Sequence, residues 1–108
     1  MDQRSARLAA NEAVFRAGNE RIDTLLADRL GTTPYMCECG DAQCFQMIDL
    51  TNDEYEAVRS HPARFAVASG HEDLTAGEVV VSESSRFTVV EKRGAEAEIV
   101  ERSNPRGS

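Results

Sequence analysis

The sequence has 108 residues and a mass of 11.9 kDa, the size of one ordinary domain, and its 41% apolar and 29% charged residues exclude a disordered chain. Nineteen acidic against twelve basic residues give a net charge of −7, which argues against direct nucleic-acid binding because phosphates attract basic surfaces. The same charge disfavours anionic membranes, and no apolar run approaches the ~20 residues that span a bilayer. We therefore expect a globular protein that binds neither nucleic acid nor membrane.

The N-terminal segment, residues 1–31, is predicted to be a long amphipathic helix whose helical residues are 2–30. Gly31 would cap its C-terminus, and Pro34 prevents its continuation. We expect this helix either to pack along its own domain or to bury part of its apolar side against a protein partner or a second copy. Its apolar positions recur at helical spacing, with charged positions opposite them. The apolar positions are Leu8, Phe15, Ile22, Leu25, Leu26 and Leu30, and the charged ones are Arg16, Glu20, Asp23 and Arg29.

Residues 35–93 are predicted to form a small α+β domain with a metal-binding knuckle, a short helix and three or four antiparallel strands. Thr51, with Glu54 three residues later, matches the capping box that begins a helix. The helix is expected over 52–60, and Pro62 prevents its extension.

The strands are predicted from short runs of apolar and β-branched residues. One run covers 45–50, a second lies around 65–67, and two more, 78–82 and 86–92, are close enough to form a hairpin. Residues 94–108 are polar, and we expect them to form a flexible tail.

All three cysteines lie within eight residues, as Cys37-x-Cys39-x4-Cys44. The N-terminus is charged and leads into no apolar signal segment, so we expect a cytoplasmic protein with reduced thiols. The odd number of cysteines also argues against a disulfide framework. Clustered thiolates favour a soft metal, and we predict Zn²⁺, with an iron–sulfur cluster as the alternative.

Tetrahedral zinc needs a fourth ligand besides the three sulfurs. His71, in a Gly-containing turn between predicted strands, is favoured over His61, which ends a helix. The remaining alternatives are a water molecule or a carboxylate from Asp41, Glu38 or Glu72, and Glu72 is also a candidate acceptor for the second ring N–H of His71. The predicted metal ligands are Cys37, Cys39, Cys44 and His71.

Three motifs occur in a characteristic order: NEAxFR at 11–16, CECGxxxC at 37–44 and GHE at 70–72. Together they resemble a family of small uncharacterised actinobacterial proteins. The resemblance covers roughly residues 8–93. It implies that the three cysteines and His71 act as one unit, and it implies no particular activity.

The sequence predicts a zinc-binding regulatory module for protein–protein interaction, with the long helix as its interaction arm. Hydrolase and nucleotide-binding motifs such as GxSxG, HExxH and the P-loop do not occur, so we expect no enzymatic activity. A redox- or metal-responsive thiol switch is the first alternative, in which oxidation of the thiolates expels zinc and releases the helix. A small enzyme with an open metal site is the second.

Overall fold

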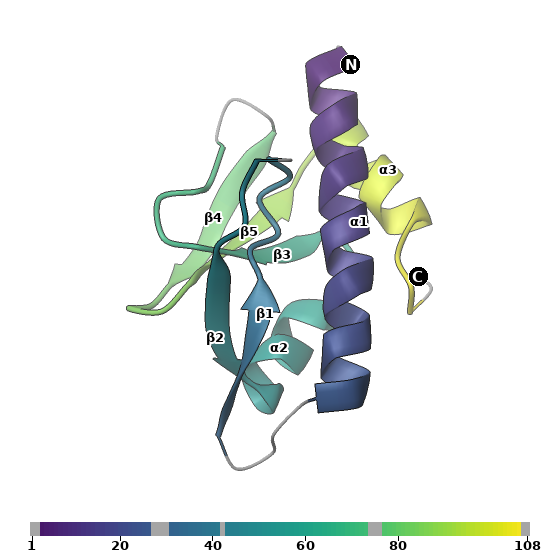
Figure 1. Cartoon of the computed structure of the whole chain (residues 1–108). Coiled ribbons are helices and arrows are strands. Elements are labelled where there is room, and N and C mark those ends of the chain that lie inside the picture. Colours follow the sequence, from purple (N-terminus) through teal and green to yellow (C-terminus); the bar gives the residue numbers. More distant parts are fainter. Residues whose placement is uncertain (1–2, 27–30, 42, 74–76, 107–108) are drawn as a thin grey trace.

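The computed structural model describes residues 3–26, 31–41, 43–73 and 77–106 (Figure 1). A long helix is followed by two strands, a short helix, three strands and a third helix, which confirms the predicted α+β class. The helices are α1 (Gln3–Leu26), α2 (Asn52–Arg59) and α3 (Ala95–Arg102), and the strands are β1 (Thr32–Met36), β2 (Met47–Thr51), β3 (Arg64–Val67), β4 (Glu78–Glu83) and β5 (Thr88–Lys92).

The five strands form two separate antiparallel sheets. β1 pairs with β2, and in the other sheet β5 lies between β3 and β4. The predicted hairpin and the strand around 65–67 are confirmed, whereas the strand predicted over 45–50 begins later, at Met47. β1 was not predicted because it contains Pro34, which has no N–H to donate. A two-stranded sheet tolerates this proline because each strand has one edge without a partner strand.

The capping box at the start of α2 is confirmed. Thr51 Oγ1 accepts a hydrogen bond from the Glu54 amide at 3.1 Å, and the Glu54 carboxylate accepts one from the Thr51 amide at 2.8 Å. The helix then buries Tyr55, whose ring stacks on that of Tyr35 with centroids 4.4 Å apart. This stack joins α2 to the β1–β2 sheet.

The prediction of a flexible C-terminal tail is wrong for residues 95–106. Residues 95–102 form α3, which packs on α1 and buries Val100 completely. Beyond it, the Arg106 guanidinium pairs with the Glu20 carboxylate of α1 at 2.9 Å. The helical pattern of this segment is only eight residues long, too short to outweigh its polar composition in a prediction.

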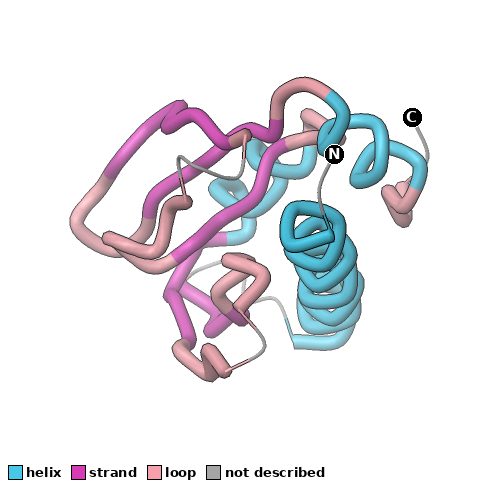
Figure 2. The backbone as a smooth tube through the Cα atoms, turned by 90° about the horizontal axis from the view of Figure 1, so that it is seen from above, coloured by secondary structure: helices cyan, strands magenta, loops and turns pink. Residues whose placement is uncertain are grey.

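Helix α1 runs along most of the molecule, beside the strands and α3 (Figures 1 and 2). Its 24 residues span ~36 Å at ~1.5 Å per residue, and the longest extent of the molecule is 42 Å. The helix therefore packs along its own domain, as one of the two expected arrangements. The predicted helical positions Arg29 and Leu30 lie within 27–30, outside the described residues. The predicted cap, Gly31, directly follows this range.

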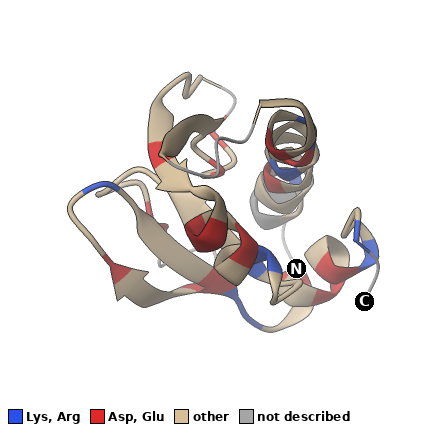
Figure 3. Ribbon diagram, turned by 90° about the horizontal axis from the view of Figure 1, so that it is seen from below, with Lys and Arg blue, Asp and Glu red and all other residues tan. Residues whose placement is uncertain are grey.

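The charged positions Arg16, Glu20 and Asp23, predicted to lie opposite the apolar positions of α1, are not on a solvent-exposed side: Arg16 is buried and the other two are half-buried. Figure 3 shows charged positions along α1, and Arg16 is fully buried together with Glu12 and Asn19. These polar side chains find partners in the rest of the chain. Arg16 donates to the Pro62 carbonyl oxygen at 2.6 Å, and its guanidinium lies 4.7 Å from the centroid of the Phe65 ring.

Some apolar residues of α1 pack against the domain, and others are exposed to solvent. Ile22 packs against the core, and Leu8 and Phe15 are half-buried. Leu25 and Leu26 are 67% and 65% exposed. Apolar residues thus make up only part of the packed face of α1. The rest of that face consists of polar side chains that form hydrogen bonds and ion pairs.

A buried ionic cluster fixes α1 to the three-stranded sheet. Lys92 Nζ lies 3.0 Å from Glu12 Oε1 and 3.0 Å from Glu78 Oε2, and all three side chains are at most 2% exposed. Burial, together with a hydrogen bond to Glu78, raises the pKa of Glu12 to about 10, so that at neutral pH Glu12 keeps its proton. The protonated Glu12 leaves one negative and one positive charge in the cluster.

We expect Lys92→Met to lower the free energy of unfolding by about 3–5 kcal/mol, because it leaves a buried carboxylate without its cation. The neighbouring Arg93, which is 64% exposed, pairs with Glu91 at 2.7 Å and is the matched control. Arg93→Met should cost less than about 1 kcal/mol. Urea unfolding followed by circular dichroism measures both losses. Equal losses in the two variants would contradict a stabilising role for the buried cluster.

Candidate metal centre

The structure brings all four predicted ligand residues together. Cys37, Cys39 and Cys44 come from the loop between β1 and β2, and His71 comes from the turn after β3. Their ligand atoms all lie within 4.8 Å of one another. His71 Nδ1 is 3.5 Å from Cys37 Sγ and 3.6 Å from Cys44 Sγ. These separations suit a single tetrahedral ion, whose bonds are ~2.3 Å to sulfur and ~2.0 Å to nitrogen.

Hydrogen bonds within the β1–β2 loop shape the cysteine knuckle. The Cys37 amide donates to the Gln46 carbonyl oxygen at 3.0 Å, which extends the pairing of β1 with β2 by one step. The Cys44 amide donates to the Asp41 carbonyl oxygen at 2.9 Å and closes a tight turn. Gly40 has a φ of +82°, a backbone conformation that residues with a Cβ rarely adopt. The chain therefore reverses within a few residues and returns Cys44 to the other two thiols.

A second set of hydrogen bonds joins the knuckle to the segment that carries His71. The Glu38 amide donates to the Ala66 carbonyl oxygen, and the Ala68 amide donates to Cys37 Sγ at 3.1 Å. The His71 amide in turn donates to the Ala68 carbonyl oxygen at 2.9 Å. The end of β3 thus fixes the distance between the histidine and the cysteines.

Two of the three cysteines lie in a buried environment that shifts the pKa values of their thiols. Cys37 and Cys39 are 2% and 8% exposed. A hydrogen bond with Cys39 raises the pKa of Cys37, and burial raises it further, whereas the same hydrogen bond lowers the pKa of Cys39 to about 5. Three thiolates this close repel one another unless a cation lies between them. A divalent ion with three thiolates and a neutral imidazole leaves a net charge of −1.

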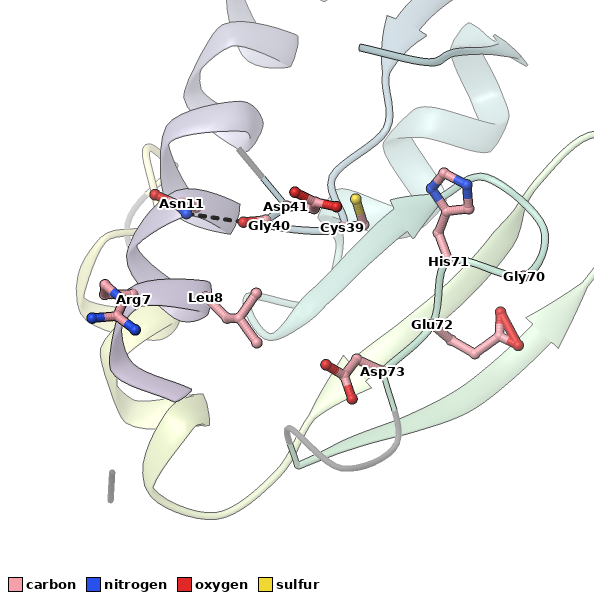
Figure 4. A pocket seen from close by; sticks show the side chains of 10 residues that line it. All are labelled: Arg7, Leu8, Asn11, Cys39, Gly40, Asp41, Gly70, His71, Glu72 and Asp73. Atoms are coloured by element: carbon pink, nitrogen blue, oxygen red, sulfur yellow. Dashed lines mark hydrogen bonds between the residues drawn. The ribbon is translucent and has the colours of Figure 1, made fainter. Parts of the chain in front are cut away.

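The side chains considered as alternative fourth ligands are not part of the cluster. His61 is exposed at the end of α2, and Asp41 accepts a hydrogen bond from the Gln43 amide. Glu72 points away from the ring of His71 (Figure 4), and its buried Oε1 has no hydrogen-bond partner in the described part of the chain. The predicted hydrogen bond from His71 to Glu72 is therefore not supported by the geometry.

Glu38 lies between two of the ligands, but its carboxylate is used for hydrogen bonds instead of metal binding. It is fully buried, and its oxygens accept hydrogen bonds from the Ala66 amide and from Asn19 Nδ2. Burial raises the pKa of Glu38 to about 7, although both hydrogen bonds oppose that rise. Asn19 was not among the site residues predicted from the sequence. The signal for it was the 3–4 spacing of the polar residues Glu12, Arg16, Asn19 and Asp23 along one side of α1.

A cavity of about 530 Å³ opens beside the four ligand residues (Figure 4). Cys39 and His71 line one side of it, and Arg7 and Asn11 of α1 line another. Asp73 also points toward the cavity. The cavity gives small molecules a path to Cys39, the thiol whose pKa is lowered.

Comparison of the chain with protein families, with curated proteins and with solved structures finds no match in any of the three. The resemblance to an actinobacterial family therefore stays a prediction, and the function has to be argued from the geometry of the site. Among the described residues, no helix is both long enough and apolar enough to cross a membrane.

Gly40 and Gly70 have a similar positive φ but different surroundings. Substituting each by alanine therefore distinguishes the cost of backbone strain from the cost of a steric clash. A Cβ on Gly40 would lie 2.8 Å from both Glu12 Cγ and the Leu8 carbonyl oxygen, whereas a Cβ on Gly70, with a φ of +85°, meets nothing within 4 Å. We expect Gly40→Ala to lower the free energy of unfolding by about 3 kcal/mol, and Gly70→Ala by only about 1 kcal/mol. Urea unfolding measures both. A Gly40→Ala variant no less stable than Gly70→Ala would show that α1 does not pack closely on the knuckle.

Proposed function

We propose that this protein is a zinc-binding domain in which Cys37, Cys39, Cys44 and His71 hold one Zn²⁺ ion. The observation that carries the proposal is the convergence of three sulfurs and one imidazole nitrogen within 4.8 Å from two segments of the chain. Soft thiolates select zinc over magnesium or calcium, and four protein ligands complete a tetrahedral shell. An iron–sulfur cluster remains the alternative occupant.

The ion has a structural role in this proposal. Four protein ligands leave no open position for a substrate or a catalytic water, which disfavours the enzyme with an open metal site. Structural zinc contributes ~10–16 kcal/mol of apparent binding free energy in small peptides. A domain of this size has a net stability of only ~5–15 kcal/mol. The ion therefore decides whether the knuckle and the turn that holds His71 stay together.

We further propose that the domain serves protein–protein recognition, with a protein partner or a second copy as the bound molecule. The packed face of α1 is occupied by its own domain, so the interaction arm is reduced to the outer positions Val14, Leu25 and Leu26. Phe45, directly after the ligand Cys44, is 85% exposed, and Met47 is 48% exposed. Zinc bound to Cys44 would hold this apolar pair in place for a partner.

The two histidines provide a matched test of the zinc site. The purified protein should contain one equivalent of zinc by elemental analysis and native mass spectrometry. His71→Gln removes one of the four ligands and should weaken zinc binding by more than ~100-fold in competition with a chelator. His61→Gln changes an exposed histidine outside the cluster and should bind zinc like the wild type.

If the purified protein instead contains stoichiometric iron and absorbs visible light, the bound group is an iron–sulfur cluster and not zinc. Equal zinc affinity in the two histidine variants would refute the four-residue site. Cys39→Ser should in addition lower the melting temperature, and an unchanged melting curve would contradict the structural role.

A redox-responsive thiol switch is the second candidate function. The specific observation in its favour is the cavity that exposes one side of Cys39 and His71. Peroxide entering this cavity could oxidise two of the thiolates to a disulfide, with reduction of the peroxide to water and loss of the zinc ion. The regulated element would be α1, because it packs directly on Gly40 of the knuckle.

Mild peroxide treatment distinguishes the two roles. For a switch, we expect zinc release with a change in the circular dichroism spectrum, and both should reverse when a thiol reductant and zinc are added. For a purely structural site, the thiols should stay unreactive in the folded protein. A chromophoric zinc indicator follows the release. Slow release with irreversible loss of structure would exclude the switch.

A further inference from the structure

Asn19 of α1 makes three hydrogen bonds at the start of the knuckle, two to the backbone of Met36 and one to the side chain of Glu38. Its Oδ1 accepts from the Met36 amide at 2.7 Å, and its Nδ2 donates to the Met36 carbonyl oxygen and to Glu38 Oε2, both at 2.8 Å. Asn19 is fully buried. Just over two turns earlier in α1, Asn11 Nδ2 donates to the Gly40 carbonyl oxygen at 2.9 Å (Figure 4). Helix α1 therefore holds the knuckle on both sides of Cys37 and Cys39.

Glu38 links the same helix to the strand that leads to His71. One carboxylate oxygen accepts from Asn19, and the other accepts from the Ala66 amide of β3 at 2.9 Å. The Glu38 amide also donates to the Ala66 carbonyl oxygen at 2.9 Å. A single buried side chain, located between two metal-binding residues, thus joins α1, the knuckle and β3.

The contacts of α1 with the knuckle are directional. Among the side chains of α1 that the structure describes, the fully buried ones are Ala9 and the polar Glu12, Arg16 and Asn19, so polar contacts dominate the most buried part of the helix. Hydrogen bonds tolerate only small changes in distance and angle, and a buried polar group that loses its partner is costly. A shift of the knuckle backbone would therefore disrupt the contacts of Asn19 and Glu38 together.

We infer that Asn19 and Glu38 couple occupancy of the metal centre to the docking of α1. The inference rests on the proposed zinc site. Bound zinc fixes the knuckle in the position in which Asn19 reaches Met36 and Glu38, whereas without zinc no metal–ligand bonds join the three cysteines to His71. Coupling between two binding events is reciprocal, so contacts that dock α1 must also retain the metal. Asn19 and Glu38 are positioning residues, since neither provides a metal ligand.

Reciprocity gives a direct test on the full-length, zinc-loaded protein. Asn19→Leu keeps the size of the side chain but removes all three hydrogen bonds, and it should speed zinc release to a chromophoric chelator by about tenfold. Asn52→Leu is the matched control, because Asn52 Nδ2 also donates a hydrogen bond to α1, to Asp23 Oδ1 at 3.0 Å, and this bond does not involve the knuckle. It should release zinc within about twofold of the wild-type rate.

Glu38→Gln provides a second variant if Asn19→Leu does not fold, as judged by circular dichroism of the zinc-loaded proteins. Glutamine has one acceptor oxygen, so it cannot accept from both Ala66 and Asn19, and it should also speed zinc release by about tenfold. A release rate equal to that of the wild type in the folded variant would overturn the inference.

Hydrogen exchange of the wild-type protein tests the coupling in the other direction. On chelation of zinc, amides of α1 between Ala9 and Asp23 should exchange at least about tenfold faster, with a smaller change in β5, whose strand partners are β3 and β4. Equal changes in α1 and β5 would overturn a specific link. A wild-type chain that binds no zinc would overturn the proposed function as well, whereas zinc binding without the coupling overturns this inference alone.

Discussion

Hydrogen bonds and ion pairs of buried polar side chains hold α1 on the rest of the chain, because a buried polar group needs a partner. Arg16 reaches two carbonyl oxygens, Asn19 binds the backbone of the knuckle, and Glu12 lies beside Lys92 in a buried ionic cluster. Each of these contacts has a specific geometry, so the helix has one position in which all of them form together. The arrangement of the other elements follows, because α1 contacts β1, α3 and the cysteine knuckle.

The candidate metal centre lies where this polar interface meets the sheet. Its ligands come from two segments, and hydrogen bonds from Ala66 and Ala68 bring those segments together. A bound ion would therefore connect elements that the protein also connects through Glu38 and Asn19. An ion held by these residues would lie beside contacts that involve both a helix and a strand, which suits a structural or regulatory ion better than a catalytic one.

The ligand residues were predictable because their chemistry is local. Three thiols within eight residues indicate a soft metal in any fold, and a glycine-flanked histidine between two strands was the better placed of two candidates. The carboxylate of Glu38 was weighed only as a ligand, since adjacency in sequence does not show which way a side chain points. The folded chain turns it toward Asn19 and Ala66. Similarly, α3 went unpredicted because its burial depends on α1, a distant part of the sequence.

The amino-acid sequence alone determined the elements whose causes lie within a few residues: the capping box of α2, the β4–β5 hairpin, the long N-terminal helix and the cysteine knuckle. Only the tertiary structure decided which side of that helix is buried. Helical periodicity identifies a stripe of apolar residues, but a polar stripe of the same period is equally able to pack when the partner surface supplies matching donors, acceptors and charges. Those partners contact the helix only after folding. They are Met36, Glu38, Lys92 and the carbonyl oxygens of Pro62 and Val100.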